Sequence, residues 1–358
     1  MPKNRTSNKE NKRITTKHNR NFKGGKIGCF LLLLLILLSL FGNVITTHDY
    51  SSQNLDLARI PPTVVATKVD NFFVFLSDVK NVVIYDGERY ITPLNIIFSN
   101  DYKSIYFEFS QKSYTILVSN EFLTITCGEN NYSQTKLIWN PEYPLGTDSL
   151  GRCFYSKLLI GLQITLIISI ISSFFSFALG LLYGAISGYM NGILSIVMAR
   201  VLDIVSVVPQ LLIVILITSF LNASIIGMII AISSVSWLKV ARIVRGATIH
   251  QRNQPCYRIL VEIGAPKVRM ITKHVIPNVI NLAAINTIAL MPSIIISESS
   301  LSFIGLGLTG NVVSLGALCS LSLDCLYSSS YLTLIPMVIL VVYLIAVSVI
   351  THDLKELG

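Results

Sequence analysis

Five long runs without a charged residue constrain this chain more strongly than any other feature of its sequence. They are residues 27–47, 158–199, 204–238, 275–297 and 325–351. A helix needs about 20 apolar residues to cross the hydrocarbon core of a bilayer, so the second and third runs allow more than one crossing each. The 358-residue chain is 52% hydrophobic and 13% charged, which is too apolar for a soluble domain of this size. We therefore expect a polytopic membrane protein.

Turn-forming residues divide the long runs and predict six transmembrane helices. Interruptions at 187–192 and at Asn222 separate three helices in the middle of the chain. The predicted spans are 28–47, 157–186, 196–220, 223–243, 279–299 and 330–351. Pro209 is expected to kink the third span, because proline donates no backbone hydrogen bond. Arg200 and Asp203 share a face of that span and are expected to form an ion pair.

The distribution of charge predicts the orientation. Residues 1–26 contain nine lysines and arginines against one acid, and residues 239–273 contain eight against one. Residues 48–148 contain twelve acids and seven bases. By the positive-inside rule, the N-terminus and the 239–276 loop are cytoplasmic and 48–148 is outside. The even number of spans also puts the C-terminus inside. The first run lacks a convincing cleavage site, so we favour a retained span over a signal peptide. Because the bases flank predicted spans, the net charge of +9 does not indicate a nucleic-acid partner.

The segment between the first two spans has a different pattern. Residues 60–140 contain seven short runs rich in β-branched and aromatic residues, which is typical of strands. Asp86-Gly87 lies between two of these runs and predicts a hairpin. We expect a β-rich extracytoplasmic insert over 48–142. It either receives a binding protein or braces the outer face, and we favour bracing.

The residues that carry chemistry in enzymes are scattered. The six cysteines have no metal-site spacing, and the five histidines form no cluster. Cys319 and Cys325 are both predicted outside, where a disulfide is one alternative and two free thiols the favoured one. The chain has no G-x-x-x-x-G-K-[ST] loop to hold a nucleotide phosphate. We expect no enzyme activity, metal or cofactor on this chain.

A basic stretch over 258–278 separates two of the apolar runs. Gly264 permits a bend and Pro277 marks a return to helix, so we expect two short helices across the membrane face. The stretch resembles the EAA loop of bacterial ABC importer permeases through Gly264 and Ile276-Pro277-Asn278, with Arg258-Ile259-Leu260 in place of Glu-Ala-Ala. An ordinary basic loop is the alternative. The resemblance implies an ATPase-coupling loop formed by Arg258, Glu262, Gly264, Ala265, Pro277 and Asn278.

Three further segments resemble the dipeptide, oligopeptide and nickel permease subfamily. YPLGTDSLGR at 143–152 resembles H-P-L-G-T-D-x-x-G-R-D, with Cys153 in place of the final acid. WLKVARIVRG at 237–246 resembles W-x-x-x-A-R-x-V-R-G, and ESSLSFIGLGL at 298–308 resembles E-A-S-L-S-F-L-G-L-G. In the first segment, Asp148 is expected to cap the following helix.

The same resemblance, together with helical rise, suggests a translocation pathway or outer gate. Its predicted members are Pro209, Glu298 and Ser302. Glu298 follows Pro277 by about 20 residues, which places it near the outer mouth of the fifth span. Its carboxylate could meet the amino terminus of a peptide, or it could cap a short outer helix.

The resemblance implies an all-α polytopic membrane protein with six transmembrane helices of the ABC importer permease type and the β-rich insert between helices 1 and 2. The implied domains are a basic cytoplasmic tail, helix 1, the insert, the permease domain with its coupling loop 250–276, and a second cytoplasmic tail. Their bounds are 1–26, 27–47, 48–142, 143–351 and 352–358.

The implied function is that of a permease subunit of an ATP-driven importer for di- or oligopeptides, working by alternating access in the bacterial cytoplasmic (inner) membrane. The implied partners are a homologous permease, two cytoplasmic ATPases that bind ATP and Mg²⁺, an extracytoplasmic solute-binding protein and the bilayer. One alternative keeps this mechanism and transports a nickel chelate or another small solute. A second is a membrane receptor that senses a ligand through the insert. A receptor would require an output domain, and the tail THDLKELG offers none.

Overall fold

The computed structural model divides into two compact units. The first comprises residues 1–40, 161–321 and 335–358, and the second comprises 41–160 and 322–334. The structure describes residues 24–41, 50, 52–76, 81–87, 90–93, 95–99, 104–118, 123–128, 130–140, 142–221, 224–308, 312–321, 323 and 330–357. Most of the predicted basic tail, the turn at Asn222 and Cys325 lie outside the described residues.

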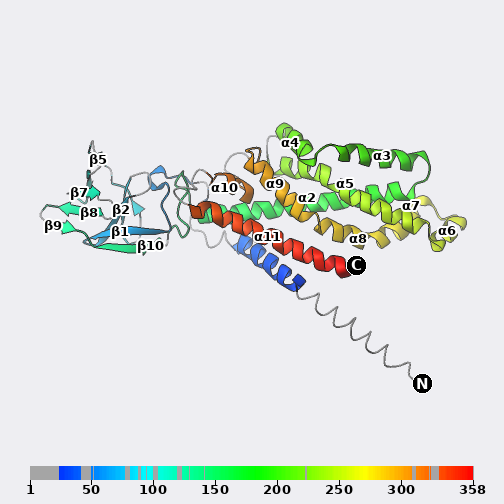
Figure 1. Cartoon of the computed structure of the whole chain (residues 1–358), viewed down its shortest axis with the longest axis horizontal. Helices are drawn as coiled ribbons and strands as arrows, with labels where there is room; N and C mark the ends of the chain where they lie inside the picture. Colours follow the sequence, from blue (N-terminus) through cyan, green and yellow to red (C-terminus); the bar gives the residue numbers. More distant parts are fainter. Residues whose placement is uncertain are drawn as a thin grey trace, which may run out of the picture. The chain divides into compact units, whose positions relative to one another are not determined.

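The first unit is helical (Figure 1). Its chain begins with the helix Gly24–Phe41. The later elements are α2 (Phe154–Tyr189), α3 (Ile193–Val207), α4 (Gln210–Phe220), α5 (Ile225–Arg252), α6 (Pro255–Glu262), α7 (Lys267–Arg269), the π-helical turn η2 (Met270–Val275), α8 (Ile276–Ile288), α9 (Met291–Phe303), α10 (Leu315–Leu321) and α11 (Ser330–Leu357). Five described helices are long and apolar enough to cross a membrane, or six if the bent pair α3 and α4 forms one span.

The bend between α3 and α4 confirms the kink expected at Pro209. The two helices meet at 85°. Val208 is extended, with φ −73° and ψ 130°, as expected for a residue that precedes proline. The expected ion pair between Arg200 and Asp203 is wrong. Asp203 lies instead 3.4 Å from the Arg242 guanidinium, so the contact joins α3 to α5 rather than closing within one helix.

Three glycines on one face of α2 allow α5 to approach closely. A Cβ atom at Gly184 would lie 2.6 Å from the Cβ of Val244 and 2.7 Å from the Ala241 carbonyl oxygen. Gly180 lies one turn before Gly184 and Gly188 one turn after it. A Cβ atom at either position would also come too close to α5. Helices in a bilayer gain little from the hydrophobic effect, so close backbone approach through small residues is a main source of their packing.

The first helix packs on α11 in a similar way. A Cβ atom at Gly28 would lie 2.8 Å from the Ala346 carbonyl oxygen and 2.9 Å from the side chain of Ile350. One turn earlier, the Gly25 amide donates a hydrogen bond to the Asp353 carboxylate. The carboxylate therefore satisfies an amide in the first turn, where helical N–H groups lack partners within the helix.

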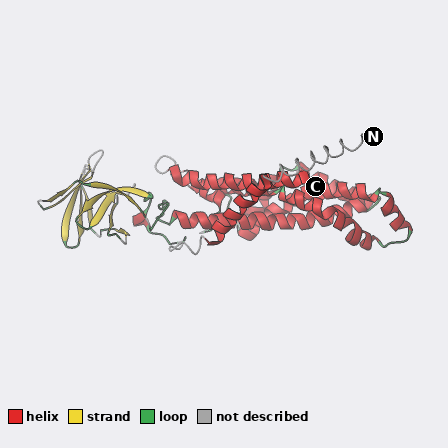
Figure 2. Ribbon diagram, turned by 90° about the horizontal axis from the view of Figure 1, so that it is seen from below, coloured by secondary structure: helices red, strands yellow, loops and turns green. Residues whose placement is uncertain are grey.

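The described residues of the second unit form ten strands in two antiparallel sheets (Figure 2). One sheet has the order β10-β1-β2-β3-β4, and the other has the order β5-β6-β7-β8-β9. The bounds are β1 Thr63–Val69, β2 Phe72–Leu76, β3 Val82–Tyr85, β4 Tyr90–Ile91, β5 Ile96–Phe98, β6 Ser104–Phe109, β7 Lys112–Val118, β8 Leu123–Cys127, β9 Asn130–Tyr132 and β10 Thr135–Trp139. The expected β-rich insert is confirmed, and so is the hairpin at Asp86-Gly87, where Tyr85 pairs with Tyr90.

A buried ionic cluster organises the segment that precedes α2. Asp148 accepts hydrogen bonds from the backbone N–H groups of Leu150 and Arg152, and its carboxylate also contacts the side chains of Arg152 and Lys157. Asp148 therefore closes this turn and does not cap α2, which begins at Phe154. Burial alone would raise the pKa of the Asp148 carboxyl, but Lys157 and the backbone donors outweigh burial and hold the pKa below its ordinary value.

Candidate functional site

The basic loop after α5 begins with the short helix α6. Pro255 occupies its first turn, where the missing N–H costs no hydrogen bond. The helix ends in a Schellman motif: the Gly264 amide donates to the Val261 carbonyl at 3.0 Å, and the Ala265 amide donates to the Leu260 carbonyl at 3.1 Å. Gly264 has φ +86°, which confirms the expected bend and explains why glycine occurs here.

Tyr257 anchors α6 to the chain that follows it. Its ring is buried in the core formed by α2, α5, η2 and α8. Its hydroxyl donates to the His274 carbonyl at 2.8 Å and accepts a hydrogen bond from the Asn278 side-chain amide at 2.9 Å. Sequence reasoning missed this residue. The available signal was the spacing of Tyr257 and Leu260. Residues three positions apart share a face of a helix, and here that is the inner face of α6.

The second of the two expected short helices is wrong. Helix resumes at Lys267 and runs through η2 into α8 and α9, so that Lys267–Phe303 is one helical segment. Pro266 at the N-cap starts this segment. Pro277 lies in the first turn of α8, directly after the π-helical turn. Proline cannot donate a backbone hydrogen bond to the carbonyl four positions earlier. The α-helical hydrogen-bond pattern is therefore interrupted here, but the helix continues.

The buried side of this segment fixes its position against α2 and α5. Met270, Val275, Val279 and Ala283 are all fully or almost fully buried. They belong to one core cluster with side chains of α2 and α5, and Ala265 packs against its edge. Tyr257 therefore joins α6 to a helical segment that is itself packed against α2 and α5.

The opposite side of the loop presents apolar side chains to solvent. Ile263 is 77% exposed and Val268 is 73% exposed, and Ile259 is also exposed. Glu262 and Lys267 lie beside them and are exposed as well. Apolar residues gathered on an exposed turn outside the predicted spans are typical of a protein-docking surface. We refer to Ile259, Glu262, Ile263, Lys267 and Val268 as the loop face.

The six predicted coupling residues fall into different positions. Gly264 and Ala265 form the turn, Pro277 and Asn278 start α8 on the exposed side, and Glu262 belongs to the loop face. Arg258 lies in the middle of α6, and its side chain is outside the described part of the chain. The structure brings Asn278 to α6 through Tyr257, which the sequence did not indicate.

Arg252 joins the start of this loop to the end of α2. Its guanidinium donates to the Met190 carbonyl at 3.0 Å and to the Asn191 side chain. These are acceptors left over at a helix C-terminus, where a positive charge is also favourable. The loop is therefore attached at both sides, to α2 through Arg252 and to α8 through Tyr257.

The predicted pathway residues Glu298 and Ser302 lie together. Glu298 is 1% exposed, and it accepts a hydrogen bond from the Ser302 hydroxyl at 3.1 Å. Ser314, at the start of α10, lies 3.3 Å from Ser302. Glu298 is inside α9, so its interpretation as a helix N-cap is wrong. Pro209 lies apart from this pair, at the break between α3 and α4.

Two family models match parts of this chain. The family described as binding-protein-dependent transport system inner membrane component matches residues 180–354. The N-terminal transmembrane domain of oligopeptide transport permease C matches residues 20–62, which include the helix Gly24–Phe41.

Two relatives with similar sequences show the same family. The oligopeptide transport system permease protein OppC of Salmonella typhimurium is 39% identical over 211 residues, which cover 59% of this chain and 70% of that protein. OppC of Escherichia coli is 37% identical with the same coverage. Among solved structures, an inward-facing MetNI methionine ABC transporter is 18% identical, with a TM-score of 0.46 over 56% of this chain and 96% of that chain. The chain belongs to the binding-protein-dependent transport system inner membrane component family.

Proposed function

We propose that this chain is a transmembrane permease subunit of an ATP-driven importer of oligopeptides. Family membership supports the role of permease, and the relatives named for oligopeptide and dipeptide transport support the class of cargo. The observation that carries the mechanism is the loop after α5, which exposes an apolar face and is tied by Tyr257 to a helix long enough to cross the membrane.

In this proposal an ATPase subunit docks on the loop face. Closure of the ATPases would move α6, and the hydrogen bonds of Tyr257 to His274 and Asn278 would carry that movement into the segment Lys267–Phe303. Packed helices shift between discrete arrangements more readily than they deform, so such a movement favours one of two states of the unit. Alternating access follows if these two states open to opposite sides of the membrane.

The proposed assembly contains a homologous permease subunit, two cytoplasmic ATPases that bind ATP and Mg²⁺, and an extracytoplasmic solute-binding protein. We place the loop and the N-terminus in the cytoplasm, because the bases cluster at these positions. The C-terminus lies on the same side if the chain crosses the membrane six times, and the second, strand-containing unit (the β unit) lies outside. Glu298 and Ser302 would act in the outer part of the pathway only if α9 and α10 separate, since both residues are buried here.

The test is uptake of a labelled tripeptide by cells that contain or lack this chain, with co-purification of its partners as a second readout. The proposal predicts loss of uptake without the chain, and recovery of ATPase subunits with the purified chain. The control is Lys136→Gln, an exposed change on β10 that should retain both properties. Equal uptake with and without the chain, or purification without an ATPase, would contradict the proposal.

A further inference from the structure

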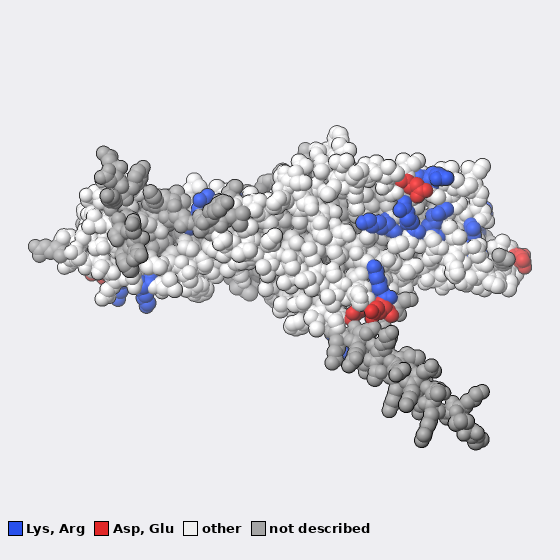
Figure 3. Space-filling view, viewed as in Figure 1, with Lys and Arg blue, Asp and Glu red and all other residues white. Residues whose placement is uncertain are grey.

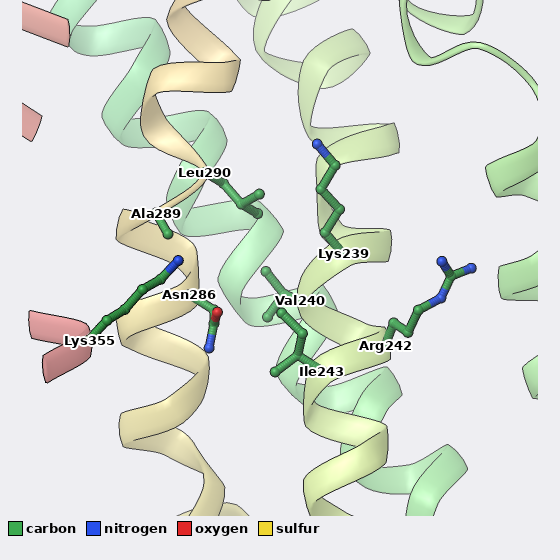
Figure 4. A pocket seen from close by; sticks show the side chains of 8 residues that line it. All are labelled: Lys239, Val240, Arg242, Ile243, Asn286, Ala289, Leu290 and Lys355. Atoms are coloured by element: carbon green, nitrogen blue, oxygen red, sulfur yellow. The ribbon is translucent and has the colours of Figure 1, made fainter. Parts of the chain in front are cut away.

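A pocket in the helical unit carries unpaired positive charge. It lies between α5, the junction of α8 and α9, and α11, and has a volume of about 370 Å³. The residues that line it are Lys239, Val240, Arg242, Ile243, Asn286, Ala289, Leu290 and Lys355. Figure 4 shows Lys355 reaching from α11 over Asn286 and Ala289, while Lys239 rises from α5 on the other side.

The cations of this pocket differ in their contacts. The Arg242 guanidinium turns toward α3, where it donates to the Ser206 hydroxyl at 2.9 Å and lies 3.4 Å from Asp203. Among the described residues, neither Lys239 nor Lys355 has an ion pair, and no acidic side chain lines the pocket. Figure 3 shows lysine and arginine side chains gathered on this side of the helical unit. No described acidic side chain therefore balances the charge of these two lysines.

The remaining lining is suited to an amphiphile. Val240, Ile243, Ala289 and Leu290 supply an apolar wall between the two lysines. The Asn286 side-chain amide donates to the Leu282 carbonyl of its own helix at 2.8 Å, which leaves its side-chain oxygen available as an acceptor. A ligand that fits all three features has an anionic group, hydroxyl donors and an adjacent apolar part.

We propose that this pocket binds the phosphodiester headgroup of an anionic phospholipid with a hydroxylated headgroup, such as phosphatidylglycerol. The phosphate lies between Lys239 and Lys355, a headgroup hydroxyl donates to Asn286, and the acyl chains follow the apolar wall. Both lysines belong to helices that are long and apolar enough to span the membrane. Basic pockets between such helices on the cytoplasmic side are suited to anionic lipids, which are concentrated in that leaflet.

The acyl chains distinguish a lipid from the other anions that two lysines could hold. Inorganic phosphate would use the cations alone and leave the apolar wall uncovered. The carboxylate of a transported peptide would bring a charged amino terminus into a pocket whose ionisable lining is entirely basic. The proposal does not depend on the class of cargo or on the ATPase partners.

The experiment titrates the purified full-length chain, with the subunits that accompany it, with phosphatidylglycerol in detergent and counts bound lipids by native mass spectrometry. The test variant is Lys239→Gln with Lys355→Gln. The matched control is Lys112→Gln with Lys136→Gln, which removes the same charge from exposed positions on β7 and β10. Phosphatidylcholine, which has the same phosphate but no net charge, is titrated in parallel.

The proposal predicts at least one tight phosphatidylglycerol site in the wild type and in the control. The test variant should bind this lipid about 30-fold more weakly, which corresponds to about 2 kcal/mol for two lysines near an anionic group. Lys355→Arg keeps the charge and should retain binding, which separates loss of the site from loss of fold. Phosphatidylcholine should bind no better to the wild type than to the test variant.

Three results would overturn the proposal. The first is equal affinity of the test variant and the wild type for phosphatidylglycerol. The second is displacement of the lipid by millimolar inorganic phosphate, which would assign the pocket to a soluble anion. The third is displacement by a tripeptide with a free carboxyl terminus but not by its amide, which would assign the pocket to the cargo.

Discussion

Replacing Tyr257 by phenylalanine tests whether α6 is held to α8 in the way the structure shows. The change keeps the buried ring and removes only the hydroxyl. The hydrogen bonds to the His274 carbonyl at 2.8 Å and from the Asn278 side chain at 2.9 Å are lost, together with a longer contact to the Gln251 side-chain oxygen at 3.3 Å that competes for the same hydroxyl proton. A hydrogen bond contributes about 1 kcal/mol net, so the loss should be about 2 kcal/mol.

The expected effect is local. Opening of α6 away from the segment that starts at Lys267 should become about 30-fold more frequent, which corresponds to the same 2 kcal/mol. The measurement is hydrogen–deuterium exchange of the peptides that cover 255–262 in the full-length protein. Asn278→Ala removes one of the two bonds and should give about half of the free-energy change.

Tyr155→Phe is the matched control. The Tyr155 ring packs at the edge of the core of the β unit, and its hydroxyl makes no hydrogen bond to the described residues. Its loss should leave exchange over 255–262 unchanged. If Tyr257→Phe also leaves this exchange unchanged, the two hydrogen bonds do not hold α6, and the route proposed for coupling is refuted.

Three further predictions concern packing, pH and orientation. Gly184→Ala should destabilise the unit to heating in detergent by about 1–3 kcal/mol, because its Cβ would meet Val244 and the Ala241 carbonyl. Gly246→Ala, which meets nothing, should be neutral or slightly stabilising, and equal behaviour of the two would contradict the close packing of α2 and α5. Asp148→Asn should destabilise the β unit by about 3 kcal/mol at pH 7. Because the folded-state pKa of Asp148 is lowered, this stabilisation is present above about pH 4 and is lost below it, so the thermal stabilities of variant and wild type should converge in acid. A membrane-impermeant thiol reagent applied to intact spheroplasts should label Cys127 and not Cys256, in variants that each keep one cysteine, and the reverse pattern would contradict the orientation.

The sequence predicted the features that depend on periodicity and on residues with special backbone properties. Charge-free runs located the long helices. Pro209 indicated the bend between α3 and α4, Asp86-Gly87 indicated the hairpin, and Gly264 indicated the bend after α6. These signals are local, because each arises from a short stretch of chain whose conformational preferences hold in most contexts.

The features that were missed depend on contacts between distant segments. The Tyr257 hydroxyl finds acceptors and donors 17 and 21 residues away, and Asp203 pairs with a residue 39 positions later. A short spacing favoured Arg200 as the partner of Asp203, but the carboxylate contacts Arg242 on α5 instead, and no local pattern indicates that contact. The seven predicted runs correspond to β1–β4 and β6–β8, so β5, β9 and β10 were also missed. Of these, β10 pairs with β1, at the other end of the insert.

The same limit explains the error after Gly264. A proline within a helical pattern usually indicates a boundary, so Pro277 was expected to start a new helix. In the structure the helix begins ten residues earlier, at Lys267. A π-helical turn precedes Pro277, and the burial of Met270 and Val275 against α2 and α5 stabilises this turn. Tertiary packing outweighed the local signal.

The most direct test of the coupling account is ATP-driven uptake of a labelled tripeptide by proteoliposomes that contain the full complex with Gly264→Val. Valine at φ +86° costs about 1–2 kcal/mol in backbone strain, and a Cβ atom there would have no neighbouring atom within 4 Å. The chain should therefore fold and insert while the loop face is displaced. Gly264→Asn is the control, because asparagine tolerates positive φ better than other side chains. The account predicts strong loss of uptake with valine and substantial uptake with asparagine. Uptake at the wild-type rate by Gly264→Val would contradict it.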